Sequence, residues 1–228
     1  MGEAKRRKQS QTAGIIYHHT STLRTNLIWM SGVIELEGRG EKPHHPQLGK
    51  MDADASLRRE MRDFPPLAWF TSSAATPRCL MDAQICLRDN ATGEIRRIDL
   101  DAQQANAISM KRVALGFQLA DIPVVAWRDH PGYQTPEGQK LNADARAVGD
   151  DPDLWYVAEE PVDAALLCEI RNADRQGRMV KLDARHVQEA RRSVELCRTT
   201  PGAYIPPAWI PVDQIQRICA EMGVPILE

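Results

Sequence analysis

The chain has 228 residues, 43% of them hydrophobic and 26% charged, which is ordinary for a globular protein and enough to bury a substantial core. Its net charge of −2 excludes an overall field that would draw it to nucleic acid or to an anionic membrane, and no stretch approaches the roughly 18 consecutive apolar residues of a membrane span. Fifteen prolines and 14 glycines exclude a simple helical bundle and indicate many short elements.

The first 13 residues are polar and basic, with four consecutive cations at 5–8. We expect a flexible tail, and the alternative is an arm that contacts phosphate. No apolar segment that could serve as a secretory core follows the tail. Five scattered cysteines without C-x-x-C spacing predict reduced, buried thiols, and together these features predict a cytoplasmic protein.

The ordered chain is predicted to begin with a strand at 14–20, "GIIYHHT". Thr20 or Ser21 can cap the helix that follows, and Gly32 is a natural terminator for that helix. A short strand, "VIEL", comes next. Residues 37–63 are polar and lack periodicity, which is typical of a long functional or disordered loop.

From residue 65 onward the chain alternates strands and helices irregularly. A strand is predicted at 65–73, "PPLAWFTSS", and a hairpin at 84–100 with its turn at 90–93. We then expect, in order, a helix after Asp101, a strand region at 111–127, a short helix ending near Gly149, strands at both ends of 154–171, a pairing strand at 176–182, a helix at 183–197 capped by Asp183, and a final helix at about 212–222.

This order has neither a steady βαβ rhythm nor a Gly-rich phosphate loop. It predicts one α+β domain over residues 14–228, with a basic tail at 1–13.

Two predicted strands end in aromatic residues followed by hydroxyls, "IYHHTS" and "LAWFTSS". The first resembles the opening strand of ADP-ribosyltransferases of the diphtheria-toxin and poly(ADP-ribose) polymerase type, which carries a Tyr-His-Gly-Thr-like segment. Tyr17, His18, His19 and Thr20 occupy that pattern, with His19 in place of glycine. The second strand is similar to the family's aromatic-hydroxyl strand.

The resemblance implies a split mixed β-sheet with flanking helices, and NAD as the substrate. It makes His18 a catalytic residue that binds the nicotinamide ribose. Tyr17 and Thr20 would contribute to NAD binding. From the second strand, the aromatic walls of the nicotinamide site and a hydroxyl would be Trp69, Phe70 and Ser72.

The family also has a catalytic glutamate on a later strand, where a carboxylate stabilises the positive charge that develops on the ribose. We prefer Glu169 because it falls in an apolar run, where a carboxylate needs a reason to be present. Glu159, Glu160 and Glu195 remain alternatives.

The resulting hypothesis is NAD-dependent mono-ADP-ribosyl transfer to a macromolecule, protein or nucleic acid, in a glycosyltransferase-class enzyme. By resemblance, such a compact enzyme implies a toxin or phage-conflict protein with an inhibitor or antitoxin partner. One alternative is a non-catalytic module that binds a protein or a nucleic acid. The other is a hydrolase with a metal at the histidine pairs 18–19 and 44–45, although adjacent residues of a strand point to opposite faces and no metal-ligand motif is present.

Overall fold

The structure is a computed structural model that describes residues 14–36, 66–78, 84–88, 95–99, 112–174 and 177–200. For 84–88 and 95–99 it describes the backbone alone. Several predicted features lie outside these residues: the tail at 1–13, the loop at 37–63, the helix after Asp101 and the helix at 212–222.

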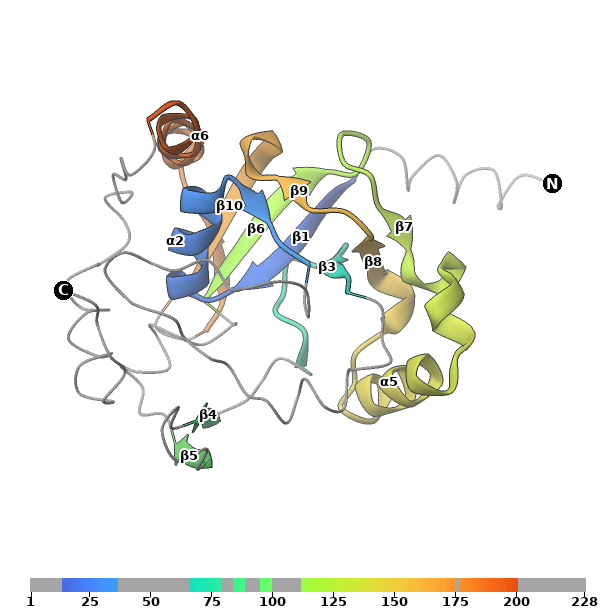
Figure 1. The fold of residues 1–228 in the computed structure, drawn as a ribbon. Coiled ribbons are helices and arrows are strands. Elements are labelled where there is room, and N and C mark those ends of the chain that lie inside the picture. Colours follow the sequence, from blue (N-terminus) through green and yellow to red (C-terminus); the bar gives the residue numbers. More distant parts are fainter. Residues whose placement is uncertain are drawn as a thin grey trace.

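A seven-stranded sheet forms the centre of the molecule (Figure 1). Its strands, in spatial order, are β11 (Met179–Lys181), β10 (Leu167–Ala173), β6 (Val113–Gln118), β1 (Ile15–Thr20), β3 (Ala68–Thr71), β8 (Trp155–Ala158) and β7 (Val125–Ala126). Each neighbouring pair runs antiparallel. The predicted α+β class is confirmed. The expected mixture of parallel and antiparallel pairs is wrong for the described strands, in keeping with a chain that lacks the βαβ crossovers parallel neighbours require.

Two smaller ladders accompany this sheet. β2 (Val33–Ile34) pairs with β9 (Val162–Asp163), and β4 (Gln84–Arg88) pairs with β5 (Ile95–Asp99), both antiparallel. The β4–β5 pair confirms the strands of the predicted hairpin, whose turn lies outside the described residues.

The helices begin and end close to where the sequence predicts. α2 (Thr22–Ser31) starts at Ser21, whose hydroxyl accepts a hydrogen bond from the Arg24 N–H at 3.0 Å, and it stops at Gly32, which has a φ of 76°. α6 (Ala184–Thr199) follows Asp183, although that side chain makes no capping bond. The other helical segments are α5 (Pro136–Ala147) and the short η2 (Trp127–Asp129), η3 (Pro131–Gln134), η4 (Pro152–Leu154) and η5 (Ala164–Leu166).

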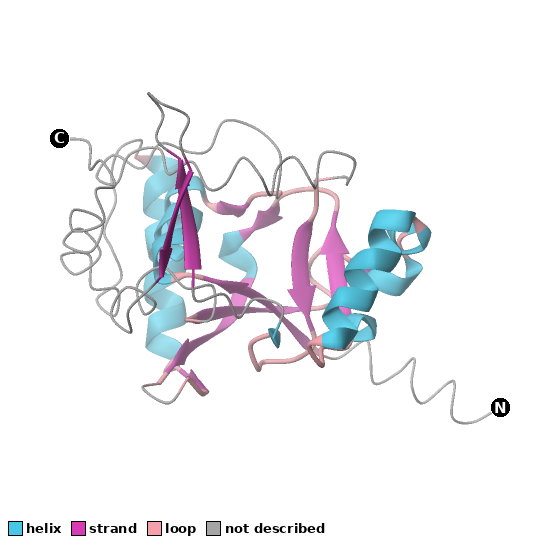
Figure 2. Cartoon of the chain, turned by 90° about the horizontal axis from the view of Figure 1, so that it is seen from below, coloured by secondary structure: helices cyan, strands magenta, loops and turns pink. Residues whose placement is uncertain are grey.

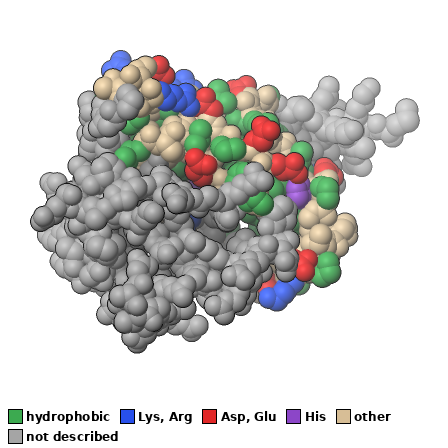
Figure 3. Space-filling view, viewed as in Figure 1, with side chains coloured by type: hydrophobic (Ala, Val, Ile, Leu, Met, Phe, Trp, Pro, Cys, Tyr) green, Lys and Arg blue, Asp and Glu red, His purple; other side chains and the backbone are tan. Residues whose placement is uncertain are grey.

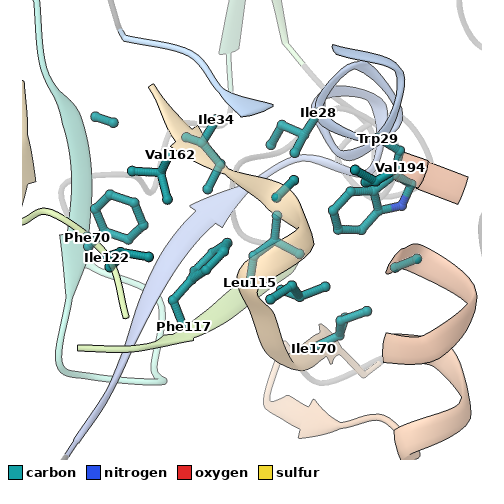
Figure 4. Close-up of a cluster of buried hydrophobic side chains, with 14 of the residues drawn as sticks. Ile28, Trp29, Ile34, Phe70, Leu115, Phe117, Ile122, Val162, Ile170 and Val194 are labelled. Carbon is teal, nitrogen blue, oxygen red and sulfur yellow. The ribbon is translucent and has the colours of Figure 1, made fainter. Parts of the chain in front are cut away.

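Helices α2 and α6 lie together at one end of the molecule and α5 lies at the other (Figures 1 and 2). The main hydrophobic core joins α2 and α6 to one face of the sheet, which we call the core face (Figure 4). Its strand residues include Ile16, Phe70, Phe117 and Ile170. A second cluster around Trp127, which includes Ala145 of α5, packs on the opposite face.

None of the helices in the described parts of the chain has the length and apolar character needed to cross a membrane. The described acidic and basic side chains are interspersed on the face that Figure 3 shows.

Candidate functional site

The two polar strand ends that the sequence singled out lie side by side. β1 pairs with β3, with Tyr17 opposite Thr71. The His18 Nδ1 lies 3.0 Å from the Trp69 carbonyl oxygen, and the His19 Nε2 lies 3.3 Å from the Ser73 carbonyl oxygen. Segments more than 50 residues apart in sequence therefore meet, side chain to backbone, at one place in the sheet.

Strand alternation divides the predicted site residues between the two faces of the sheet. Neighbouring residues of a strand point to opposite faces, and directly opposed residues share a face. His18, Thr20 and Phe70 belong to the core face. Tyr17, Trp69 and Glu169 belong to the opposite face.

This division corrects part of the predicted arrangement. Trp69 and Phe70 cannot enclose one ring between them, because they leave β3 in opposite directions. For the same reason His18 and Glu169 do not face a common ligand. His18 and Phe70 do share the core face, but their rings are in direct contact, with centroids 5.6 Å apart, and do not flank a space for a third ring.

His18 is a neutral side chain in this position. Burial lowers its pKa to about 4, and the neighbours that modulate this pKa are the Trp69 carbonyl, His19 and Arg24. A carboxylate would raise the pKa, and none of the described residues contributes one. A carbonyl oxygen can only accept, so His18 Nδ1–H donates to Trp69 and ties β1 to β3.

Two further candidates, Trp69 and Ser72, make contacts within the fold, and a third, Thr20, is buried. Trp69 packs edge-on against Trp127 and Trp155, at ring distances of 4.9 and 5.8 Å. Ser72 is exposed and binds the Leu154 carbonyl through its N–H at 2.9 Å. The Thr20 hydroxyl is buried and has no hydrogen-bond partner within the described parts of the chain.

The opposite face carries a compact polar cluster centred on Glu169, whose side chain is only 3% exposed. The Tyr17 hydroxyl donates to Glu169 Oε1 at 2.9 Å, and Arg171 Nε donates to the same oxygen at 2.6 Å. Lys181 Nζ donates to the other oxygen, Oε2, at 2.6 Å. We call these four residues the Glu169 cluster. It spans β1, β10 and β11, with β6 passing between Tyr17 and Glu169.

A β-bulge aims Glu169 toward this face. Leu167 lies opposite Phe117 and Glu169 opposite Gly116, so β10 has one extra residue, Cys168, between them. Leu167 belongs to the core face, whereas Glu169, two residues later, points the other way. Without the bulge both side chains would lie on the same face.

Gly116 allows Tyr17 to reach the carboxylate across β6. A Cβ at position 116 would lie 2.9 Å from the Glu169 Cβ and 3.1 Å from the Tyr17 Cε1. Both distances are shorter than ordinary van der Waals contacts. Glycine is therefore the residue that lets the two side chains meet over this strand.

The cluster holds Glu169 ionised. Burial alone would raise the pKa of this carboxyl, but the bonds from Lys181, Arg171 and Tyr17 outweigh burial and leave the pKa below its ordinary value. Burial and the neighbouring carboxylate raise the pKa of the Tyr17 hydroxyl, which stays protonated. With one anion and two cations, the cluster carries a net charge of +1.

The alternative glutamates have different surroundings. Glu159 is 70% exposed along its side chain and accepts from the buried His130 at 3.0 Å. Glu160 and Glu195 are exposed. Glu169 is thus the buried carboxylate among the four, in line with the reasoning that selected it.

Arg171 and Lys181 belong to the site, but the sequence did not single them out. The signal for Arg171 was its place two residues after Glu169, which puts both side chains on one face of a strand. Lys181 could be found only from its register opposite Arg171.

The described residues contain no group of three or more His, Cys, Asp and Glu side chains arranged to hold a metal ion. His44 and His45 lie outside them. Cys168 and Cys197 carry free thiols, as predicted, but both are only partly buried, and the expectation of buried thiols is wrong for these two positions.

Comparison of the chain with models of protein families, with curated proteins and with solved structures finds no match.

Proposed function

We propose that the protein is an NAD-dependent mono-ADP-ribosyltransferase that modifies a macromolecular acceptor, and that its reaction takes place at the Glu169 cluster. One observation carries the proposal: the Tyr17 hydroxyl lies 2.9 Å from the Glu169 carboxylate. The resemblance to ADP-ribosyltransferases selected both residues, 152 positions apart, for one site. Their contact favours that hypothesis over an unrelated surface cluster.

The chemistry fits an ionised, buried carboxylate. The bond between the ribose C1′ and the nicotinamide nitrogen breaks, and the nicotinamide leaves with the electron pair. The ribose then carries a developing positive charge, which Glu169 stabilises from close range in surroundings that contain little water. A nucleophile of the acceptor bonds to C1′ and releases its proton to solvent water.

The remaining members of the cluster suit the rest of the NAD molecule. Arg171 and Lys181 bring two positive charges, and the Lys181 side chain is 62% exposed. A pyrophosphate is the kind of anion that such a pair binds. The Arg171 guanidinium also lies 5.5 Å from the centre of the Tyr17 ring, a contact that orders both side chains.

In this proposal His18 is a positioning residue. Its ring donates to Trp69 and packs against Phe70, so it joins the two strands whose ends flank the site.

The test compares Glu169→Gln with Glu195→Gln, a matched control at an exposed position on α6. Each purified protein is incubated with NAD labelled in its adenylate half and a cell lysate, and both transferred label and released nicotinamide are measured. The wild type and the control are expected to transfer label, whereas Glu169→Gln loses at least 100-fold in rate.

NAD binding by each variant, followed by calorimetry, separates lost chemistry from lost folding. Glu169→Gln that binds NAD but does not release nicotinamide supports the proposal. A wild-type protein that neither binds NAD nor releases nicotinamide, with protein and nucleic-acid acceptors both supplied, would contradict it. So would a Glu169→Gln variant with the rate of the control.

A further inference from the structure

His19 is a buried imidazole whose two nitrogens have different surroundings. His19 lies near the end of β1 and is 5% exposed. Its Nε2 lies 3.3 Å from the Ser73 carbonyl oxygen. Since a carbonyl oxygen accepts hydrogen bonds and cannot donate them, Nε2 carries the ring proton in this contact.

The other nitrogen, Nδ1, is left as an unprotonated acceptor. It is buried and meets no hydrogen-bond donor among the residues that the structure describes. Burial lowers the pKa of His19 to about 4, so the ring stays neutral at physiological pH. A buried acceptor without a donor is costly, so such an atom in a native protein calls for an explanation, and a bound ligand that supplies the donor is one.

The position of His19 associates this acceptor with the proposed site. His19 follows Tyr17 by two residues and shares its face of the sheet, at a spacing of about 7 Å along the strand. The residue opposite His19 on β6 is Ala114, and the residue opposite Ala114 on β10 is Arg171 of the Glu169 cluster. His19 therefore lies on the face of the sheet that carries the cluster, next to Tyr17 along β1.

We propose that Nδ1 of His19 accepts a hydrogen bond from the nicotinamide-riboside half of NAD, from either a ribose hydroxyl or the carboxamide N–H. This inference rests on the proposed function and assigns a substrate-positioning role to the histidine that replaces the family's glycine. It gives the two adjacent histidines different tasks, with His18 joining strands and His19 contacting substrate.

Two amide substitutions separate the two ring nitrogens. In His19→Gln the longer side chain places an N–H near the position of Nε2, so it can still donate to Ser73 but offers no acceptor at Nδ1. In His19→Asn the shorter side chain places its oxygen near Nδ1 and loses the Ser73 bond. The expected affinities for NAD, measured by calorimetry, are a loss of about tenfold in His19→Gln and a value within about threefold of the wild type in His19→Asn.

Melting temperatures of the two variants distinguish a substrate-positioning role of His19 from a purely structural one. If His19 served only to bond Ser73, then His19→Gln would be the more native-like variant in both stability and NAD affinity. The proposal predicts opposite orders: His19→Gln melts closer to the wild type but binds NAD less tightly than His19→Asn. NAD affinities that follow the melting temperatures would overturn it.

Binding of NAD, ADP-ribose and ADP distinguishes a ribose hydroxyl from the carboxamide N–H as the donor to Nδ1. ADP has neither the nicotinamide nor its ribose, so the His19→Gln variant should bind it as tightly as the wild type does. ADP-ribose keeps the ribose hydroxyls but lacks the carboxamide. A loss for both NAD and ADP-ribose assigns the donor to a hydroxyl, and a loss for NAD alone assigns it to the carboxamide.

The possible failures are distinguishable. A wild type that does not bind NAD overturns the proposed function and this inference with it. A wild type that binds NAD, with a His19→Gln variant of equal affinity, overturns the inference alone. An equal loss of ADP affinity also overturns it, because that loss would place the effect outside the nicotinamide-riboside half.

Discussion

The two adjacent histidines of β1 have different surroundings because they lie on opposite faces of the sheet. Residues 18 and 19 have the same side chain and nearly the same burial effect on pKa, yet alternation sends them to opposite faces of the sheet. His18 meets the hydrophobic core through Phe70, and His19 meets the segment that follows β3. The two side chains therefore differ in their contacts although they are of one type.

The low pKa values of these histidines predict a dependence of stability on pH. Both values are about 4 in the folded protein, against an ordinary value of 6.5. Between these limits the unfolded chain binds protons that the folded chain does not, so the free energy of unfolding falls as the pH falls from 6.5 to 4. The slope is at most about 1.4 kcal/mol per pH unit for each histidine.

Urea unfolding at several pH values measures this slope. The variant His19→Gln removes one of the two histidines and should reduce the slope by up to about 1.4 kcal/mol per pH unit, while His18 and carboxyls with lowered pKa values, such as Glu169, supply the rest. A slope that is the same in His19→Gln and in the wild type would show that His19 does not titrate differently in the two states.

Sequence reasoning could find Glu169 but not its partners. A carboxylate in an apolar run needs compensation, and Glu169 indeed accepts three hydrogen bonds from Tyr17, Arg171 and Lys181. Which face it occupies depends on the bulge at Cys168. The local residue types do not predict that bulge. The motifs alone suggested that Glu169 and His18 face a common site, and this prediction is wrong.

At the scale of elements, local chemistry located the ends of helices better than it located strand partners. Ser21 and Gly32 mark the limits of α2 because a hydroxyl cap and a left-handed glycine act over a few residues. The antiparallel order of the seven strands depends on contacts between distant segments. Composition and periodicity therefore gave the α+β class but not the direction of the strands.

One long-range contact fastens the last turn of α6 to the end of α2. The Arg198 Nη2 donates to the Gly32 carbonyl at 3.0 Å and to the Asp163 carboxylate, which also accepts from the Ala165 N–H at 2.7 Å. The Gly32 carbonyl belongs to the C-terminal cap of α2, and Asp163 belongs to β9. This single side chain thus joins three elements.

Replacing Arg198 should weaken the packing of α6. Because the arginine and aspartate side chains are 36% and 43% exposed, solvent screens their attraction, and we expect Arg198→Ala to lower the free energy of unfolding by about 1 kcal/mol. Arg192→Ala, at an exposed position of the same helix, is the matched control and should change stability by less than about 0.5 kcal/mol. Equal effects in urea unfolding of the two variants would show that the contact contributes nothing.

At the scale of the whole molecule, the sheet separates the main hydrophobic core from the face that carries the proposed site. The core face is covered by α2 and α6, and its side chains at Ile16, Leu115 and Ile170 are at most 1% exposed. The opposite face carries the Glu169 cluster and the aromatic cluster around Trp127. β6 and β1 lie inside the sheet and contribute residues to both faces. The proposed site therefore includes strands that are paired on both sides.

This arrangement predicts an ordered pattern of amide hydrogen exchange. β6 bonds to β1 on one side and to β10 on the other, and residues 113–117 are all buried, so its amides should exchange only through global unfolding. β7 and β11 lie at the two edges of the described sheet and have short pairings, so local fraying should expose their amides much sooner. Exchange followed by NMR spectroscopy in the absence of ligand should rank β6 and β1 slowest and β7 and β11 fastest. Amides of β7 or β11 as protected as those of β6 would mean that the sheet continues beyond that strand, by pairing within the chain or between two copies. At the β11 edge, such pairing would also fix the backbone that carries Lys181.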